Sequence, residues 1–305
     1  MMAFDTVILA SSFLRALLER EFMQLALITG ILIGFLAPLI GAFVVIKRLS
    51  LIADTLSHFS LAGLAIGMYF INILALPIGD PLYIGMVFGV IGALLIEILR
   101  SYYRNYKEIS MPIVISIGTA LSALFISLSG GFNSSVYNYL FGSILTVGSN
   151  FVIIISIVTL LILTLIIIFY KQVVIISFDE AYARLLGIPI RKFQVVTTIL
   201  LGIVVSLAIE TVGVLLVGSL MIIPVATAMK VGRSFKNTLF LAILFSEGSV
   251  ILGLWFSYIF SIPSGATIVL FNIAILVGVI ILKKFIFKHS LKEKQEPVEQ
   301  AVQHE

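Results

Sequence analysis

The chain has 305 residues, of which 61% are hydrophobic and only 11% are charged, and it contains no cysteine. A soluble domain is about 45–50% apolar and about 25% charged, so the composition excludes an ordinary soluble protein and requires apolar surface that faces lipid. The lack of cysteine excludes disulfides and thiolate metal sites. The net charge of +4 gives no reason to expect nucleic acid as a partner, because in a membrane protein the positions of the cations matter more than their sum.

The first 21 residues predict an amphipathic helix at the membrane surface. Charged residues, among them Asp5, Arg15 and Glu19, are interspersed with large apolar ones. This pattern is typical of an interfacial helix and not of a cleavable signal peptide.

Long, continuous apolar runs follow, and they predict an all-α polytopic membrane protein with eight or nine transmembrane helices. A barrel is excluded because its strands alternate in short segments. Since a span needs about 20 apolar residues, we expect spans at 22–46, 52–72, 82–99, 111–129, 141–170, 194–211, 212–230, 237–260 and 265–283. Residues 22–285 would form one transmembrane domain, and the polar tail over 286–305 is expected to be disordered.

Two of these stretches are not simple spans. The fifth is long for one crossing, and its start at 137–146 is compatible with a short helix at the outer surface. The sixth and seventh are short, and residues 211–228 contain Gly213, Gly218 and Pro224. This segment is compatible with two spans, with a kinked helix, or with a re-entrant or broken helix next to a transport pathway.

The basic residues predict the orientation of the chain. Lysines and arginines cluster in the loops near 47–48, 100–107, 171–192 and 230–236 and in the tail, whereas the loops at 73–81, 130–137 and 261–264 contain neither. The positive-inside rule therefore places the basic loops and the C-terminus in the cytoplasm. Nine spans would leave Arg15 and Arg20 outside, so eight spans stay compatible with the pattern.

Asp54 and His58 are the strongest functional candidates among the ionisable residues inside the spans. A charge at the bilayer centre is costly, so such residues are functional candidates by default. The two are four residues apart and share one face of a helix, with Ser57 on a neighbouring face. Carboxylate and imidazole are common ligands of divalent transition metals. An internal hydrogen bond or a proton relay would use the same spacing, and two ligands do not complete a metal site.

Glu210 and Glu247 also fall within predicted spans. Each is a candidate for the lining of an entry or exit path, but for both we favour a structural role. Glu97 is expected to be structural because it lies about one turn from the cytoplasmic end of its span.

Residues 178–191 predict a cytoplasmic coupling segment. Apolar Tyr182, Leu185 and Leu186 are mixed with charges, and Gly187 and Pro189 end the helical pattern. The chain lacks a G-x-x-x-x-G-K-[ST] loop, so any ATP would have to be bound by another chain. This segment is where such a chain would dock.

Four motifs resemble the permease subunits of the ABC-type zinc/manganese/iron uptake family. Residues 49–63 (LSLIADTLSHFSLAG) are similar to its D-x-x-S-H-x-x-x-x-G signature, and 178–187 to its F-D-x-x-x-A-x-x-x-G segment, with Phe178, Asp179, Ala183 and Gly187 in place. Residues 212–228 and 257–270 (SYIFSIPSGATIVL) are similar to two further family segments. The resemblance covers roughly residues 20–285.

The resemblance implies a permease subunit in the plasma membrane of a bacterium, without catalytic activity or a permanently bound cofactor. It implies a homodimer with two cytoplasmic P-loop ATPase subunits and an extracytoplasmic metal-binding protein. Asp54 and His58 would then bind the metal in the pathway, and two copies of the chain would supply two carboxylates and two imidazoles.

The run 52–63 looks most like the zinc permeases of Gram-positive bacteria, so zinc is the expected cargo, with manganese or iron as the alternative. A proton-coupled secondary carrier that uses Asp54 and His58 as a relay is a runner-up. An intramembrane metalloenzyme is a third hypothesis, disfavoured by the absence of H-E-x-x-H.

Overall fold

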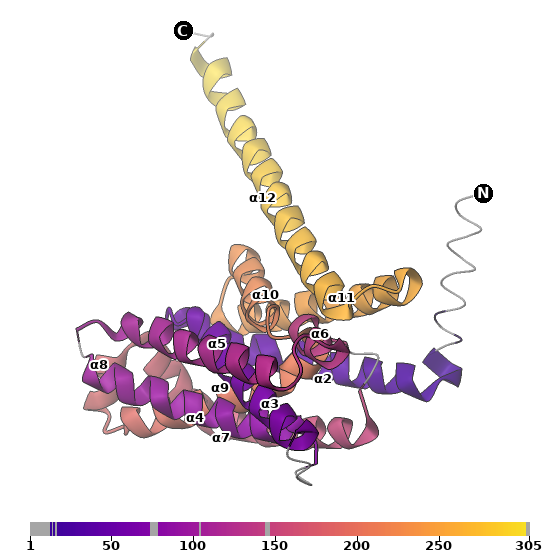
Figure 1. The fold of residues 1–305 in the computed structure, drawn as a ribbon. Coiled ribbons are helices and arrows are strands. Elements are labelled where there is room, and N and C mark those ends of the chain that lie inside the picture. The colour runs from indigo at the N-terminus through magenta and orange to yellow at the C-terminus, as the bar shows by residue number, and fades with distance from the viewer. Residues whose placement is uncertain are drawn as a thin grey trace.

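The computed structural model describes residues 13, 15, 17–73, 79–103, 105–143 and 147–302. Side chains are described up to Phe285, except that of Asn72. Every regular element within these ranges is helical, which confirms the all-α expectation. Most of the long helices pack side by side in a bundle, from which α12 (Ser264–Val302) projects (Figure 1). The amphipathic helix predicted for residues 1–21 falls mostly outside the described residues, as do Arg104 and residues 144–146.

The other elements follow in chain order. They are α2 (Glu21–Ile46), α3 (Leu51–Asn72), α4 (Pro81–Tyr102), the 3₁₀ turn η1 (Lys107–Ile109), α5 (Ser110–Leu128), α6 (Ser134–Phe141), α7 (Ser149–Phe178), α8 (Glu180–Leu185), α9 (Ile190–Val212), α10 (Val217–Val231) and α11 (Phe235–Phe260). In the described part of the chain, eight helices are long and apolar enough to cross a membrane, and α10 is a shorter apolar helix of 15 residues. The predicted count of eight or nine is thereby confirmed.

The backbone breaks between α9 and α10, as the broken-helix alternative predicted. Gly213 has φ +88°, a left-handed conformation that glycine adopts without steric cost. The linker N–H groups of Val214 and Leu215 donate to the carbonyls of Tyr139 and Leu140 in α6, at N···O distances of 2.9 and 3.3 Å. The short helix α6 therefore satisfies backbone groups that the break leaves open, as buried non-helical backbone requires.

The fifth predicted span begins later than the sequence indicated. Its first part forms α6, which is capped by the Asn133 side chain accepting from Val136 N at 2.9 Å. The spanning helix α7 starts at Ser149 and extends to Phe178, instead of covering 141–170. The short outer helix expected at 137–146 thus corresponds to α6, which ends at Phe141.

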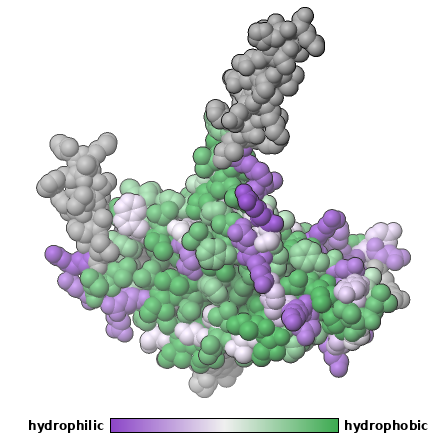
Figure 2. All heavy atoms as spheres, turned by 180° about the vertical axis from the view of Figure 1, so that it is seen from behind, coloured by the Kyte–Doolittle hydropathy of each residue, from purple (hydrophilic) through white to green (hydrophobic). Residues whose placement is uncertain are grey.

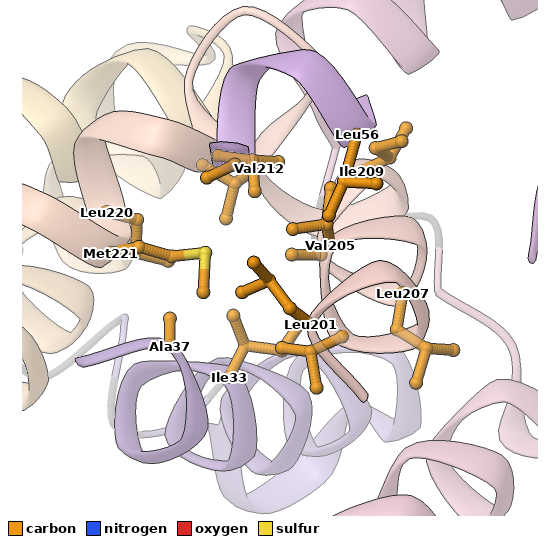
Figure 3. Close-up of a cluster of buried hydrophobic side chains, with 14 of the residues drawn as sticks. Ile33, Ala37, Leu56, Leu201, Val205, Leu207, Ile209, Val212, Leu220 and Met221 are labelled. Atoms are coloured by element: carbon orange, nitrogen blue, oxygen red, sulfur yellow. The ribbon is translucent and has the colours of Figure 1, made fainter. Parts of the chain in front are cut away.

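The apolar core lies where α2, α3, α9 and α10 meet. Leu56, Leu201, Val205, Val212 and Met221 point toward one another from these helices (Figure 3). Glycines let the helices approach closely, because a Cβ atom at Gly41 would overlap the Met221 carbonyl oxygen, and one at Gly202 would lie 2.6 Å from the Gly89 carbonyl oxygen. This is the packing role that small residues have between membrane helices.

The face of the molecule in Figure 2 is mostly apolar, with hydrophilic residues gathered in limited areas. Such a surface suits a lipid environment, in which apolar side chains need no burial within the protein. The helix α12 continues to Val302, through most of the tail for which polarity predicted disorder. Lysine, glutamate and glutamine are abundant in this stretch, and all three favour helix.

Candidate metal site and coupling segment

Asp54 and His58 lie in the first two turns of α3, and both are half-buried. Their neighbours Ala53, Leu56 and Ser57 are fully buried, so the helix is covered by protein on several sides at this depth. The carboxylate sits in the first helical turn, where the helix dipole favours a negative charge. The pair therefore lies on one face of α3, as the spacing predicted.

The start of α10 packs directly against the Asp54 carboxylate. A Cβ atom added at Gly218, the second residue of α10, would overlap Asp54 Oδ1. The helix break at 213–216 places the N-terminal turn of α10 at this position, so the linker and the carboxylate are parts of one arrangement. The sequence singled out Gly218 as a helix breaker but did not predict this contact.

His58 is fixed from the other side by α5. A Cβ atom added at Gly118 would lie 2.9 Å from the carbonyl carbon and oxygen of His58. Only glycine allows α5 to approach α3 this closely. The backbone that carries the imidazole is therefore held in place by packing, which restricts where the ring can reach.

The ligand atoms of the pair are available for binding. Neither the Asp54 carboxylate nor the His58 imidazole has a hydrogen-bond partner among the described residues. Ser57 is buried, and its hydroxyl donates to the Asp54 backbone carbonyl at 2.9 Å. No group of three or more histidine, aspartate or glutamate side chains in the described ranges is placed to hold one metal ion. The described residues of one chain thus bring two candidate ligands together and no third.

Glu210 and Glu247 are not brought into a common group with this pair. Glu247 in α11 faces α2, where its Oε1 atom would lie 3.2 Å from a Cβ atom on Gly34, and this oxygen has no hydrogen-bond partner. Glu210 lies near the end of α9, and its buried Oε2 atom is also without a partner. Each carboxylate thus has one buried oxygen without a hydrogen-bond partner among the described residues.

The environment of Glu210 includes the short helix α6. Burial, with the nearby carboxylates of Asp80 and Glu210, raises the pKa of Tyr139 above its ordinary value. The Tyr139 hydroxyl therefore remains protonated at any physiological pH and can act as a donor.

Glu97 behaves as expected, because its Oε1 atom accepts from Arg100 at 3.1 Å and from Thr198 at 2.9 Å, which is a structural network.

The predicted coupling segment forms a capped helical turn. Asp179 is the N-cap of α8, and its Oδ1 atom accepts from Tyr182 N at 2.9 Å. Ala183 is fully buried against Ile176 and Ile190. Gly187 follows the helix with φ +73°, the left-handed conformation that often ends helices.

The remaining apolar side chains of this segment are uncovered. Phe178, Tyr182 and Leu185 are 63%, 52% and 86% exposed, respectively. The buried Ala183 thus anchors the segment to the bundle, while its other face presents large apolar groups at the end of the bundle labelled α8 in Figure 1. Such a patch is typical of a protein interaction site.

Comparison with known proteins gives a consistent result. A sequence profile of the ABC 3 transport family matches residues 19–283. The manganese transport system membrane protein MntC of Listeria innocua is 34% identical over 259 residues, which cover 85% of this chain and 89% of that protein. The manganese import system permease protein ScaB of Streptococcus gordonii is 31% identical over 259 residues, 85% of this chain and 90% of that protein.

A solved structure is similar in fold and sequence. The structure of PsaBC from Streptococcus pneumoniae in complex with Fab matches with a TM-score of 0.76 and 32% identity. The match covers 88% of this chain and 95% of the other.

Proposed function

Because this chain belongs to the ABC 3 transport family, as the permease subunit of a metal importer whose ATPase activity resides in separate subunits, we propose that the metal it carries is manganese. The sequence favoured zinc and kept manganese as the alternative. Two relatives that match most of the chain are named for manganese, and this supports the alternative over zinc.

The chemistry of the site is compatible with manganese. Carboxylate oxygens suit Mn²⁺, and imidazole suits most divalent transition metals. Zinc binds a given set of nitrogen and oxygen ligands more tightly than manganese, so affinity alone does not set the cargo. We therefore place selectivity in the geometry around Asp54 and His58, which Gly218 and Gly118 fix by close packing.

The structural observation that carries the proposal is the pair Asp54 and His58, whose side chains have no hydrogen-bond partner among the described residues, at the contact of α3 with α10. Two ligands from one chain do not complete a site, and no third candidate lies close enough within the described residues. A homodimer would bring two Asp54 carboxylates and two His58 imidazoles to a shared pathway. Four protein ligands would then meet one ion between two copies of the chain.

Coupling to ATP would run through α8. In our proposal the exposed side chains of Phe178, Tyr182 and Leu185 contact a cytoplasmic P-loop ATPase, one on each copy of the permease. Movement of this segment would be transmitted by the buried Ala183 to α7 and α9, and α9 leads through the break to α10 and Asp54. An extracytoplasmic metal-binding protein would deliver the ion at the opposite face, where α6 lies.

Radiometal uptake by the reconstituted complex tests this proposal. The permease and its ATPase are placed in proteoliposomes, the delivery protein is added outside, and ⁵⁴Mn uptake is measured with and without ATP. We expect ATP-dependent uptake that excess unlabelled Mn²⁺ abolishes and that an equal excess of Fe²⁺ reduces less. Equilibrium binding to the purified complex should give one Mn²⁺ per two permease chains.

Other outcomes would lead to different conclusions. Faster ATP-dependent uptake of ⁶⁵Zn than of ⁵⁴Mn would restore zinc as the cargo. Uptake that requires a proton gradient and persists without ATP would contradict the importer mechanism itself.

A further inference from the structure

A basic groove lies between α4 and the start of α9, away from Asp54 and His58. It has a volume of 1030 Å³. Five cationic side chains line it, together with one carboxylate, Glu97, which is already paired with Arg100. The five cations are Arg100, Lys107, Arg184, Arg191 and Lys192. The groove therefore carries an excess of positive charge that no described side chain neutralises.

The walls of the same groove are apolar. Leu94 and Ile98 of α4 and Val196 of α9 line it, and they are 40%, 62% and 50% exposed. Exposed aliphatic walls beneath a basic rim form an amphipathic cavity. A small anion such as phosphate would use the rim but gain nothing from the walls.

The outer face of α4 indicates that this groove opens toward lipid. Exposed side chains recur along it with helical spacing: Tyr83, Val87, Ile91, Leu94, Ile98 and Tyr102. The two tyrosines are 19 positions apart, which is roughly 28 Å along a helix at about 1.5 Å per residue, close to the ~30 Å thickness of the hydrocarbon layer. Tyrosines favour the two membrane interfaces, so Tyr102 marks the headgroup level at the end where the cations gather.

We propose that this groove binds an anionic phospholipid of the cytoplasmic leaflet. Its phosphate would contact Arg191 and Lys192, and one acyl chain would lie along Leu94, Ile98 and Val196. Basic pockets between transmembrane helices on the cytoplasmic side are suited to anionic headgroups, and the apolar walls supply the chain-binding part. The site joins α4 to α9, so the lipid would hold together two helices of the bundle.

The test compares two lipids that differ in headgroup charge only. The purified permease–ATPase complex is delipidated and titrated with dioleoylphosphatidylglycerol or dioleoylphosphatidylcholine, and bound lipid is counted by native mass spectrometry. The groove variant is Arg191→Gln/Lys192→Gln, and both residues are exposed, so folding should be preserved. The matched control, Lys171→Gln/Arg233→Gln, removes the same charges from exposed positions that do not line the groove.

We expect the wild type to retain phosphatidylglycerol in preference to phosphatidylcholine. The groove variant should bind phosphatidylglycerol about 25-fold more weakly, on the order of fivefold for each cation removed, and the control should bind like the wild type. High salt should weaken binding in the wild type, because it screens exposed charges.

Four outcomes would overturn the proposal. Equal retention of phosphatidylglycerol by the groove variant and the wild type would show that the groove is not the site. Equal binding of both lipids would indicate ordinary annular lipid. Complete displacement by inorganic phosphate would mean that the rim serves a free anion. Phosphatidylglycerol binding by the separated permease that the permease–ATPase complex lacks would mean that the partner ATPase covers the rim instead. None of these results depends on which metal the protein carries.

Discussion

At the residue scale, Asp54 and His58 are ionisable side chains whose placement inside a membrane-spanning helix is costly and whose polar atoms have no hydrogen-bond partner in the described part of the chain. Ionisable groups within a membrane-spanning helix are unfavourable unless they are paired or serve a function. Here neither side chain has a hydrogen-bond partner among the described residues. Metal binding in the pathway, as proposed above, would use both groups.

We predict that Asp54→Ala or His58→Ala reduces metal uptake more than about 100-fold, since each removes a ligand from each copy of the chain. Loss of a group that only hydrogen-bonds to a metal ligand already lowers metal affinity or activity about 10–100-fold. Uptake of ⁵⁴Mn in proteoliposomes measures the effect. Co-purification of the ATPase should be unchanged, which separates transport from assembly. Wild-type uptake in both variants would remove the pair from the pathway.

Gly218 gives a second prediction at this scale. Replacement by alanine forces the Asp54 carboxylate to move, because the new Cβ atom would overlap Oδ1. We expect Gly218→Ala to lower manganese affinity about 10–100-fold, which is the effect typical of losing a group that holds a metal ligand in position. Equilibrium binding of manganese measures this change. Gly248→Ala is the matched control, because a Cβ atom there meets nothing within 4 Å. Equal affinity of the two variants would contradict the contact.

At the scale of elements, two turns position the helices around the candidate site and the predicted coupling segment. The break at 213–216 positions the start of α10 against Asp54, and α8 with Gly187 connects α7 to α9. Both depend on glycines with positive φ, Gly213 and Gly187. Glycine adopts such conformations without steric cost, so both turns depend on the residue type at these two positions.

We predict that Gly187→Ala uncouples ATP hydrolysis from transport. A left-handed backbone costs an ordinary L-residue about 1–2 kcal/mol, so alanine would shift the end of α8. Uptake per ATP hydrolysed should fall severalfold, while metal binding at equilibrium stays unchanged. Gly187→Asn is the control, because asparagine tolerates this conformation. If Gly187→Ala transports with normal stoichiometry, the coupling assignment is wrong.

At the scale of the whole molecule, the distribution of charge predicts how the chain crosses the membrane. Basic residues gather at one set of loops, and the intervening loops lack them. The positive-inside rule predicts that α8 and the C-terminus face the cytoplasm and that α6 faces outward. The anionic lipid groove and the ATPase contact would then lie at the same, inner side.

The absence of cysteine allows a direct test of this orientation. We predict that a membrane-impermeant maleimide labels Ser135→Cys in α6 from outside intact cells. Lys284→Cys in α12 should be labelled only in inside-out vesicles. Both positions are exposed, so accessibility to the reagent depends on sidedness alone. The reverse labelling pattern would invert the topology.

The sequence alone determined the class of the protein, most of its spans and the main candidate residues. Composition requires lipid-facing helices because no soluble core hides so much apolar surface. The i,i+4 spacing places Asp54 and His58 on one face, and the mixed apolar and charged pattern that Gly187 ends predicts α8. These features are local, so periodicity, spacing and turn residues are sufficient to reveal them.

Only the tertiary structure decided what these residues meet. The break at Gly213 could equally have been a kink, and its placement follows from hydrogen bonds to α6, which is far away in the sequence. The contact of Gly218 with Asp54, the isolation of Glu247 from that pair and the groove between α4 and α9 likewise depend on which helices are neighbours. Helix packing brings together positions that no sequence pattern relates, and for this reason the pair Asp54 and His58 could be predicted while its surroundings could not.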